Sequence, residues 1–249
     1  AMVKELREMT GAGMMDCKKA LNETNGNMDE AVEFLRKNGQ AKAEKKASRI
    51  AAEGLCMVVT KDDQTAAVVE VNSETDFVAK NATFQEFVKA VATQAVNSDA
   101  ADMDAFMAEK WNEDASKTVS EALVEKVAVI GENLKIRRFE KVVAEHGCVV
   151  PYVHGGGRIG VIVDADTDVV NDTVKEAMHN IAMQIAALNP KYVSRDEVSA
   201  DYIAHEKEIL LAQIMNDPKE SQKPEKVIEG MITGRINKEL KEICLLDQV

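Results

Sequence analysis

Residues 54–72, GLCMVVTKDDQTAAVVEVN, decide the fold class of this chain. Two runs rich in strand-forming residues, 54–60 and 65–72, flank the polar tetrapeptide 61–64. This arrangement predicts an antiparallel β-hairpin. Ala, Glu, Lys and Leu are common elsewhere in the chain and favour helices. A strand hairpin within a helix-rich chain indicates an α+β protein.

The hairpin is followed by segments that complete a first α+β subdomain, expected over 54–136. A polar loop, SETDFVAKN, comes first. Thr83, with Glu86 three residues later, has the spacing of a capping box and predicts a helix to about residue 96. A second helix is expected over 119–130. Gly131 should end it, because glycine is a typical helix-ending residue.

A second α+β subdomain is expected over 137–249. Three β-like runs, 133–145, 148–154 and 158–164, predict a second antiparallel sheet, and an amphipathic helix should follow over 172–188. At about 200–243, two long helical stretches are separated by a short proline-containing segment. They predict an antiparallel coiled-coil hairpin within this subdomain.

The first 53 residues form a compositionally distinct unit. Ten basic and nine acidic side chains nearly balance there, whereas the whole chain has a formal net charge of −12. Three short helices are expected within 1–40, the third ending at Gly39. Such a small module has little core, so an exposed apolar patch on it would be a docking surface. Residues 41–53 predict a basic helical linker, and a solvated helix is favoured there over phosphate binding.

Composition argues against several classes of partner. An acidic chain does not suit nucleic acid, which needs clustered Lys and Arg. The longest apolar runs fall well short of the roughly 20 residues that a membrane helix needs. The four scattered cysteines have no CxxC spacing, so we expect reduced thiols and no zinc site. With no secretory signal, a cytoplasmic protein is expected.

Motifs for enzymatic chemistry are weak. The segment 155–160 satisfies GxGxxG, but strand formers follow it, so a hairpin turn is favoured over a dinucleotide site. We find neither a GxSxG elbow nor a phosphate loop, and the four histidines lack metal spacing. No cofactor, bound metal or covalent chemistry of the chain's own is therefore expected.

Phe77 is the residue that the polar loop does not explain. It could pack back against the helix near Phe84, or it could stay exposed as an anchor for a pocket on a partner. In the second case Asp76 would bring a carboxylate to the same partner.

Several motifs resemble the elongation factor Ts family, in that family's order and over nearly the whole chain. They are TGAGMMDCKKAL at 10–21, ETDFVAKN at 74–81, GENLKIRR at 131–138, HGGGRIGVIV at 154–163, AMHNIAMQIAALNPKYV at 177–193 and KPEKVIEGMITGRINKELKEICLLDQ at 223–248. The resemblance implies a three-helix module like a ubiquitin-associated domain, a linker, two related α+β subdomains and a coiled-coil hairpin. It also implies a guanine nucleotide exchange factor that releases GDP from elongation factor Tu.

The resemblance assigns roles to particular residues. Thr75, Asp76, Phe77 and Val78 would dislocate the Mg²⁺ held by elongation factor Tu. Further partner contacts would come from Met14, Met15, Lys18 and His154.

The chain differs from the family's usual pattern at both ends, and its oligomeric state and an alternative function stay open. The family usually continues past the hairpin, and in this chain Ala1 precedes Met2, so a shortened C-terminal end and an altered N-terminus are expected. The coiled-coil hairpin permits a homodimer as well as a monomer. The alternative function is a non-catalytic adaptor, which would bind a partner through the three-helix module and coiled coil without changing nucleotide release.

Overall fold

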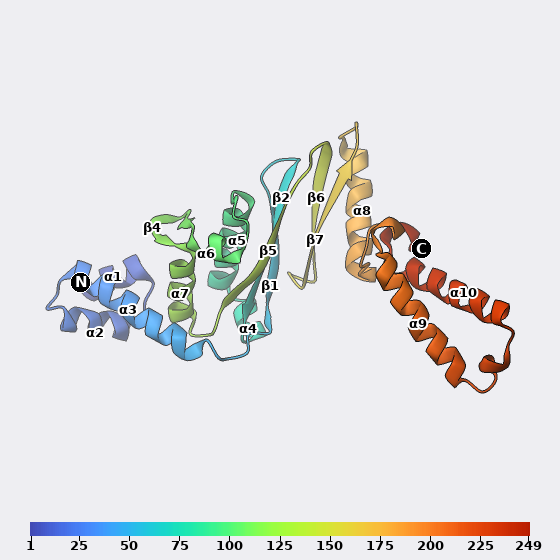
Figure 1. Ribbon diagram of the computed structural model, residues 1–249. Helices are drawn as coiled ribbons and strands as arrows, with labels where there is room; N and C mark the ends of the chain where they lie inside the picture. The colour runs from blue at the N-terminus through green and yellow to red at the C-terminus, as the bar shows by residue number, and fades with distance from the viewer. The chain divides into compact units, whose positions relative to one another are not determined.

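The computed structural model describes residues 1–249, which divide into two compact units, Ala1–Met183 and Gln184–Val249 (Figure 1). Helices and small antiparallel sheets alternate along the chain, so the predicted α+β class is confirmed. Each unit is described by itself.

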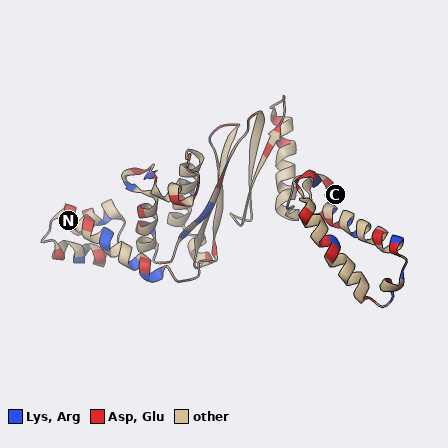
Figure 2. Ribbon diagram, in the orientation of Figure 1, with Lys and Arg blue, Asp and Glu red and all other residues tan.

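The first unit begins with the three predicted helices, α1 (Met2–Thr10), α2 (Met14–Glu23) and α3 (Met28–Lys46). They share a small core built from Leu6, Cys17, Ala20, Leu21 and Ala31. The ribbon in Figure 2 shows Lys and Arg residues gathered in the last part of α3, where the sequence predicted a basic linker.

The predicted end of the third helix at Gly39 is wrong. Helix α3 continues to Lys46, so the first six residues of the expected linker 41–53 belong to it. Gly39 is buried because α3 crosses helix α7 (Val119–Ile130) there, and a Cβ at Gly39 would lie 3.6 Å from the Cβ of Ala128. The glycine serves close helix packing at this position, not helix termination.

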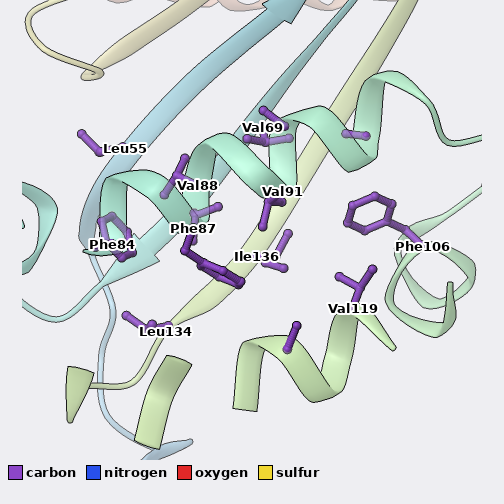
Figure 3. Packing of buried hydrophobic residues seen from close by; sticks show 14 of the residues in the cluster. Leu55, Val69, Phe84, Phe87, Val88, Val91, Phe106, Val119, Leu134 and Ile136 are labelled. Carbon is purple, nitrogen blue, oxygen red and sulfur yellow. The ribbon is translucent and has the colours of Figure 1, made fainter. Parts of the chain in front are cut away.

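The predicted β-hairpin is confirmed as β1 (Glu53–Thr60) and β2 (Thr65–Ser73). Alternate side chains, such as Leu55, Val69 and Val71, point into the main core. Helix α5 (Ala82–Val96) covers this face, and Figure 3 shows its apolar side chains meeting those of the strands and of α7.

The run 133–145 does not belong to a second sheet, so that prediction is wrong. It forms β5 (Lys135–Val143), which pairs antiparallel with β2 and gives the strand order β1-β2-β5. The buried side chain of Ile136 completes the first core at this point. The boundary predicted between 136 and 137 therefore falls inside a strand of the first sheet.

The remaining two strands, β6 (Gly147–His154) and β7 (Ile159–Asp166), form a separate two-stranded sheet joined by the glycine turn (Gly155–Gly157). The predicted hairpin reading of GxGxxG is thus confirmed. This sheet packs on the outer face of the first, where a Cβ at Gly160 would lie only 2.9 Å from Val68 Cγ2. Helix α8 (Asp172–Leu188) packs against β6 and β7 through Val174 and Met178.

Shorter elements fill the segment between β2 and α7. They are α4 (Asp76–Ala79), α6 (Met103–Ala108), β3 (Lys110–Trp111) and β4 (Asp114–Thr118). The capping box predicted for Thr83 is wrong, because Asn81 caps α5 by accepting a hydrogen bond from the Phe84 N–H. A complete capping box is found instead at Thr118 and Glu121, at the start of α7.

The second unit contains the predicted helical hairpin, made of α9 (Ala200–Asn216) and α10 (Glu225–Ile243) (Figure 1). Its buried seam includes Ile214, Ile228, Ile232, Ile236 and Leu240. Three 3₁₀ turns, η1 (Arg195–Glu197), η2 (Glu220–Gln222) and η3 (Leu245–Asp247), complete the unit.

Candidate functional site

The expected polar loop after β2 contains a helical turn, α4. Thr75 is its N-cap, and the Thr75 hydroxyl oxygen accepts a hydrogen bond from the Val78 N–H at 3.3 Å. Ala79 is buried beneath the turn, whereas Phe77 is 80% exposed and Phe84 is completely buried. Phe77 therefore does not pack back near Phe84, and the alternative that placed it there is wrong.

Asp76 lies beside this exposed ring. Its carboxylate receives a hydrogen bond from Lys80 Nζ at 2.8 Å, and its side chain is 47% exposed. The hydrogen bond from Lys80, and then the charge of Lys80, hold the pKa of Asp76 below its usual range. The α4 turn thus presents an apolar ring and an ionised carboxylate side by side.

The α4 turn and the glycine turn line the same groove, although they lie about eighty residues apart in the sequence. Asp76 and Lys80 line one part of this 370 Å³ groove, and Gly155–Arg158 line another. The turn is fixed in place because the Cys56 N–H donates to the Gly157 carbonyl oxygen at 2.7 Å. Partial burial, and then the charge of Glu70, raise the pKa of the Cys56 thiol, which also lines the groove.

His154 is the last residue of β6, immediately before the glycine turn. The Tyr152 hydroxyl lies 2.7 Å from His154 Nδ1, so this ring nitrogen has a partner within the chain. Nε2 is left as the imidazole atom for contact with another molecule. The side chain of His154 is exposed but is not among the residues that line the groove.

The predicted contacts on the N-terminal module lie on α2. Met14 is 58% exposed and Met15 is 76% exposed, and Lys18 is exposed in the next turn. They share neither the groove nor a core cluster with α4. The structure therefore presents them as a surface of their own.

Sequence reasoning missed the residues that hold the α4 turn. The most prominent is Glu132, whose carboxylate accepts hydrogen bonds from the Thr75 backbone N–H and hydroxyl. Its place in the GENLKIRR segment was the available signal, but a motif does not reveal which distant residue its side chain touches.

No three His, Cys, Asp or Glu side chains cluster in a way that could hold a metal ion. No helix combines the length and the apolar character needed to cross a membrane.

An exposed aromatic ring on a capped turn, together with exposed methionines on a small helical module, is typical of the class of proteins that dock onto another protein. A family model described as elongation factor TS matches residues 74–249. The chain belongs to the elongation factor Ts family.

Curated relatives carry the same name. Elongation factor Ts of Clostridioides difficile (strain 630) is 54% identical over 248 residues, covering 99% of this chain and 80% of the relative. The elongation factor Ts of Clostridium novyi (strain NT) is 49% identical over 249 residues, covering 100% of this chain and 80% of its own length. That of Halothermothrix orenii is 48% identical over 247 residues, covering 99% of this chain and 81% of its own.

Proposed function

We propose that this chain accelerates the release of GDP from elongation factor Tu, the exchange activity of its family, by inserting the α4 turn beside the bound Mg²⁺. The observation that carries the proposal is the exposure of Phe77, 80% of whose surface is open on a capped turn next to an ionised carboxylate. A large apolar ring exposed in this way suits a pocket on a partner.

The mechanism depends on the strict coordination geometry of the Mg²⁺ bound to elongation factor Tu. This ion demands near-ideal octahedral geometry from oxygen ligands at about 2.0–2.1 Å, so a shift of about an ångström in the surrounding helices costs it contacts. Phe77 enters an apolar slot of the GTPase beside the metal, and Asp76 disturbs the polar network behind it. Thr75 and Val78 complete the inserted turn.

The other predicted residues act at separate places on the partner. His154 reaches the opposite side of the nucleotide, near the phosphate loop of elongation factor Tu. The Tyr152 hydroxyl orients the His154 ring. Met14 and Met15, with Lys18 nearby, grip the GTPase domain. Methionine suits this role because its flexible side chain adapts to irregular surfaces.

The test is the dissociation of fluorescent GDP from elongation factor Tu, followed by stopped flow with and without this chain. We expect a large acceleration that depends on the concentration of the chain. Phe77→Ala and Asp76→Ala should each reduce it by about 30-fold or more, because buried aromatic and charged anchors contribute roughly 2 kcal/mol or more. The far-ultraviolet circular dichroism should not change, because neither side chain is part of the core.

Ile50→Ala is the matched control, because Ile50 is an apolar side chain that is 83% exposed, close to the 80% of Phe77. It should leave the release rate within about twofold of the unmodified chain. Near-normal exchange by the double variant Phe77→Ala/Asp76→Ala would reject the role of the α4 turn. A complex without any acceleration of release would favour the adaptor alternative.

Homodimerisation through the helical hairpin remains a prediction. The hairpin leaves apolar side chains partly exposed, including Leu211 at 44%, Met215 at 53% and Val227 at 46%. A second copy of the chain would cover them. Sedimentation equilibrium over a wide concentration range tests this, and a single monomer mass at all concentrations would reject it.

A further inference from the structure

The segment 131–133, far from α4 in the sequence, holds the start of the α4 turn by hydrogen bonds. Glu132 Oε2 accepts hydrogen bonds from the backbone N–H groups of Glu74 and Thr75, at 3.0 Å and 3.1 Å. Glu132 Oε1 accepts a third from the Thr75 hydroxyl at 2.6 Å. One carboxylate, two residues beyond the end of α7, thus binds both the main chain and the side chain of the N-cap residue.

Glu74 returns the contact in the opposite direction. Glu74 Oε1 accepts a hydrogen bond from the Asn133 N–H at 2.6 Å and lies 3.6 Å from a guanidinium nitrogen of Arg49. The Asn133 side-chain amide also donates to the Arg49 carbonyl oxygen at 2.7 Å. We call this reciprocal arrangement of Glu74 and Glu132 the clasp. It ties together three segments that are distant in the sequence.

The clasp matters because α4 is too short to orient itself. Four residues form a single turn, and one turn does not gain enough hydrogen bonds to offset the entropy of ordering it. Its direction must therefore come from neighbouring groups. Hydrogen bonds to an ionised carboxylate are about twice as strong as neutral ones, so Glu132 provides a firm attachment at Thr75.

Few other groups share this task. The Ser73 hydroxyl donates to the Thr75 carbonyl oxygen at 2.9 Å, and buried Ala79 anchors the far end of the turn. Phe77 lies between these attachments with its ring in solvent. Without Glu132 the turn keeps its connection to β2 but loses three hydrogen bonds at its N-terminal end.

We propose that Glu132 is a positioning residue for nucleotide exchange, acting through Thr75 to fix the direction in which Phe77 projects. This inference rests on the proposed function, in which Phe77 is the inserted side chain. In this role Glu132 sets how much of the docked population has Phe77 aligned for insertion. Its loss should therefore lower the maximal release rate more than it lowers affinity for the partner.

The experiment measures GDP release from elongation factor Tu at saturating concentrations of four full-length chains: unmodified, Glu132→Ala, Phe77→Ala and the double variant. We expect Glu132→Ala to reduce the maximal rate by about 10-fold, and the affinity, measured separately by titration, by less than threefold. In the Phe77→Ala background, Glu132→Ala should change the rate by less than twofold, because no aligned ring remains to be lost. Equal effects in both backgrounds, or no effect in either, would overturn the inference.

Glu132→Gln is the conservative variant. Its amide oxygen still accepts from the two backbone N–H groups, whereas its NH₂ cannot accept the Thr75 hydroxyl hydrogen. We expect it to recover part of the rate lost in Glu132→Ala. A rate no higher than that of Glu132→Ala would count against positioning through Thr75.

Glu109→Ala is the matched control for loss of a hydrogen-bonded carboxylate. Glu109 accepts from Ser98 Oγ and from Gln94 Nε2, both away from the α4 turn. This variant should lower the melting temperature without changing the release rate. A similar loss of rate in Glu109→Ala would show that general destabilisation, not positioning, explains Glu132.

Amide hydrogen exchange of the free chain separates the two proposals. The Glu74 and Thr75 amides should be protected in the unmodified chain and should exchange faster in Glu132→Ala. Faster exchange of these amides with an unchanged release rate would overturn the positioning role alone. Normal release by Phe77→Ala would instead overturn the proposed function and, with it, the role of Glu132.

Discussion

Phe77 and Phe84 show how neighbouring residues of one type are used differently. Phe84 is completely buried under the first sheet, whereas Phe77 is 80% exposed. Leaving a Phe side chain in water forgoes roughly 1.5–3 kcal/mol of burial free energy. The Phe77 ring therefore adds no burial free energy to the stability of the free chain. Its exposure is better explained by docking onto a partner.

Lys80 is the main cause of the lowered pKa of Asp76. Because the hydrogen bond and charge of Lys80 lower the pKa of Asp76, Lys80→Met should raise that pKa toward its ordinary value. A carboxyl ¹³C titration by NMR measures the change directly. Lys80→Arg, which keeps the charge, should leave the pKa nearer to that of the unmodified chain.

The sign of the linked effect on stability follows from the direction of the shift. A lowered folded pKa stabilises the fold above the unfolded pKa of Asp76, and this contribution is lost as the pH falls through the folded pKa. In Lys80→Met the folded pKa of Asp76 should lie closer to its unfolded pKa. Asp76 should therefore contribute less to the fall in the free energy of unfolding at acidic pH. An unchanged Asp76 titration in Lys80→Met would show that Lys80 is not the cause.

The glycine turn holds the β6–β7 sheet against β1. Gly157 has a φ of +100°, and a Cβ there would lie 2.7 Å from Leu55 Cδ2 and 3.1 Å from the Cys56 carbonyl oxygen. Gly157→Ala should therefore destabilise the first unit by about 2 kcal/mol or more, from backbone strain plus the clash. Urea unfolding followed by circular dichroism measures the loss.

Gly156→Ala is the matched control for this turn. Gly156 has a φ of +67°, but a Cβ there would meet nothing within 4 Å. Only the cost of the left-handed conformation remains, about 1 kcal/mol. Equal losses for the two substitutions would mean that the approach to β1 contributes nothing.

The elements that the sequence predicted well are those with strong local patterns. The β1–β2 hairpin, helices α7 and α8 and the two helices of the hairpin in the second unit all follow from periodicity and turn residues. The pairing of β5 was missed because strand propensity does not identify a partner. Here the partner was chosen by the fit of Ile136 into a core formed by residues far away in the sequence.

The candidate site was predictable to a similar degree. Phe77 was predicted as a candidate because a large apolar side chain is unusual in a polar segment. The groove shared with the glycine turn and the clasp at Glu132 could not be predicted, because both depend on contacts between distant segments. A single sequence contains no direct record of such contacts.

The proposed function places a thermodynamic requirement on the complete chain and its partner. If the chain lowers the affinity of elongation factor Tu for GDP by some factor, GDP must lower the affinity of elongation factor Tu for the chain by the same factor. Calorimetric titrations around the four-sided cycle should give two equal ratios. Phe77→Ala should reduce both ratios together, and a change in only one of them would contradict the linkage.

The strand order β1-β2-β5 also has a consequence for how the chain is made. The whole segment 74–134 must be synthesised before β5 can pair with β2. At about 5–20 residues per second, one side of β2 waits roughly 3 to 12 seconds for its partner on the ribosome. During that time the unpaired backbone of β2 is a template for misassociation, so this interval is when the nascent chain has most need of protection.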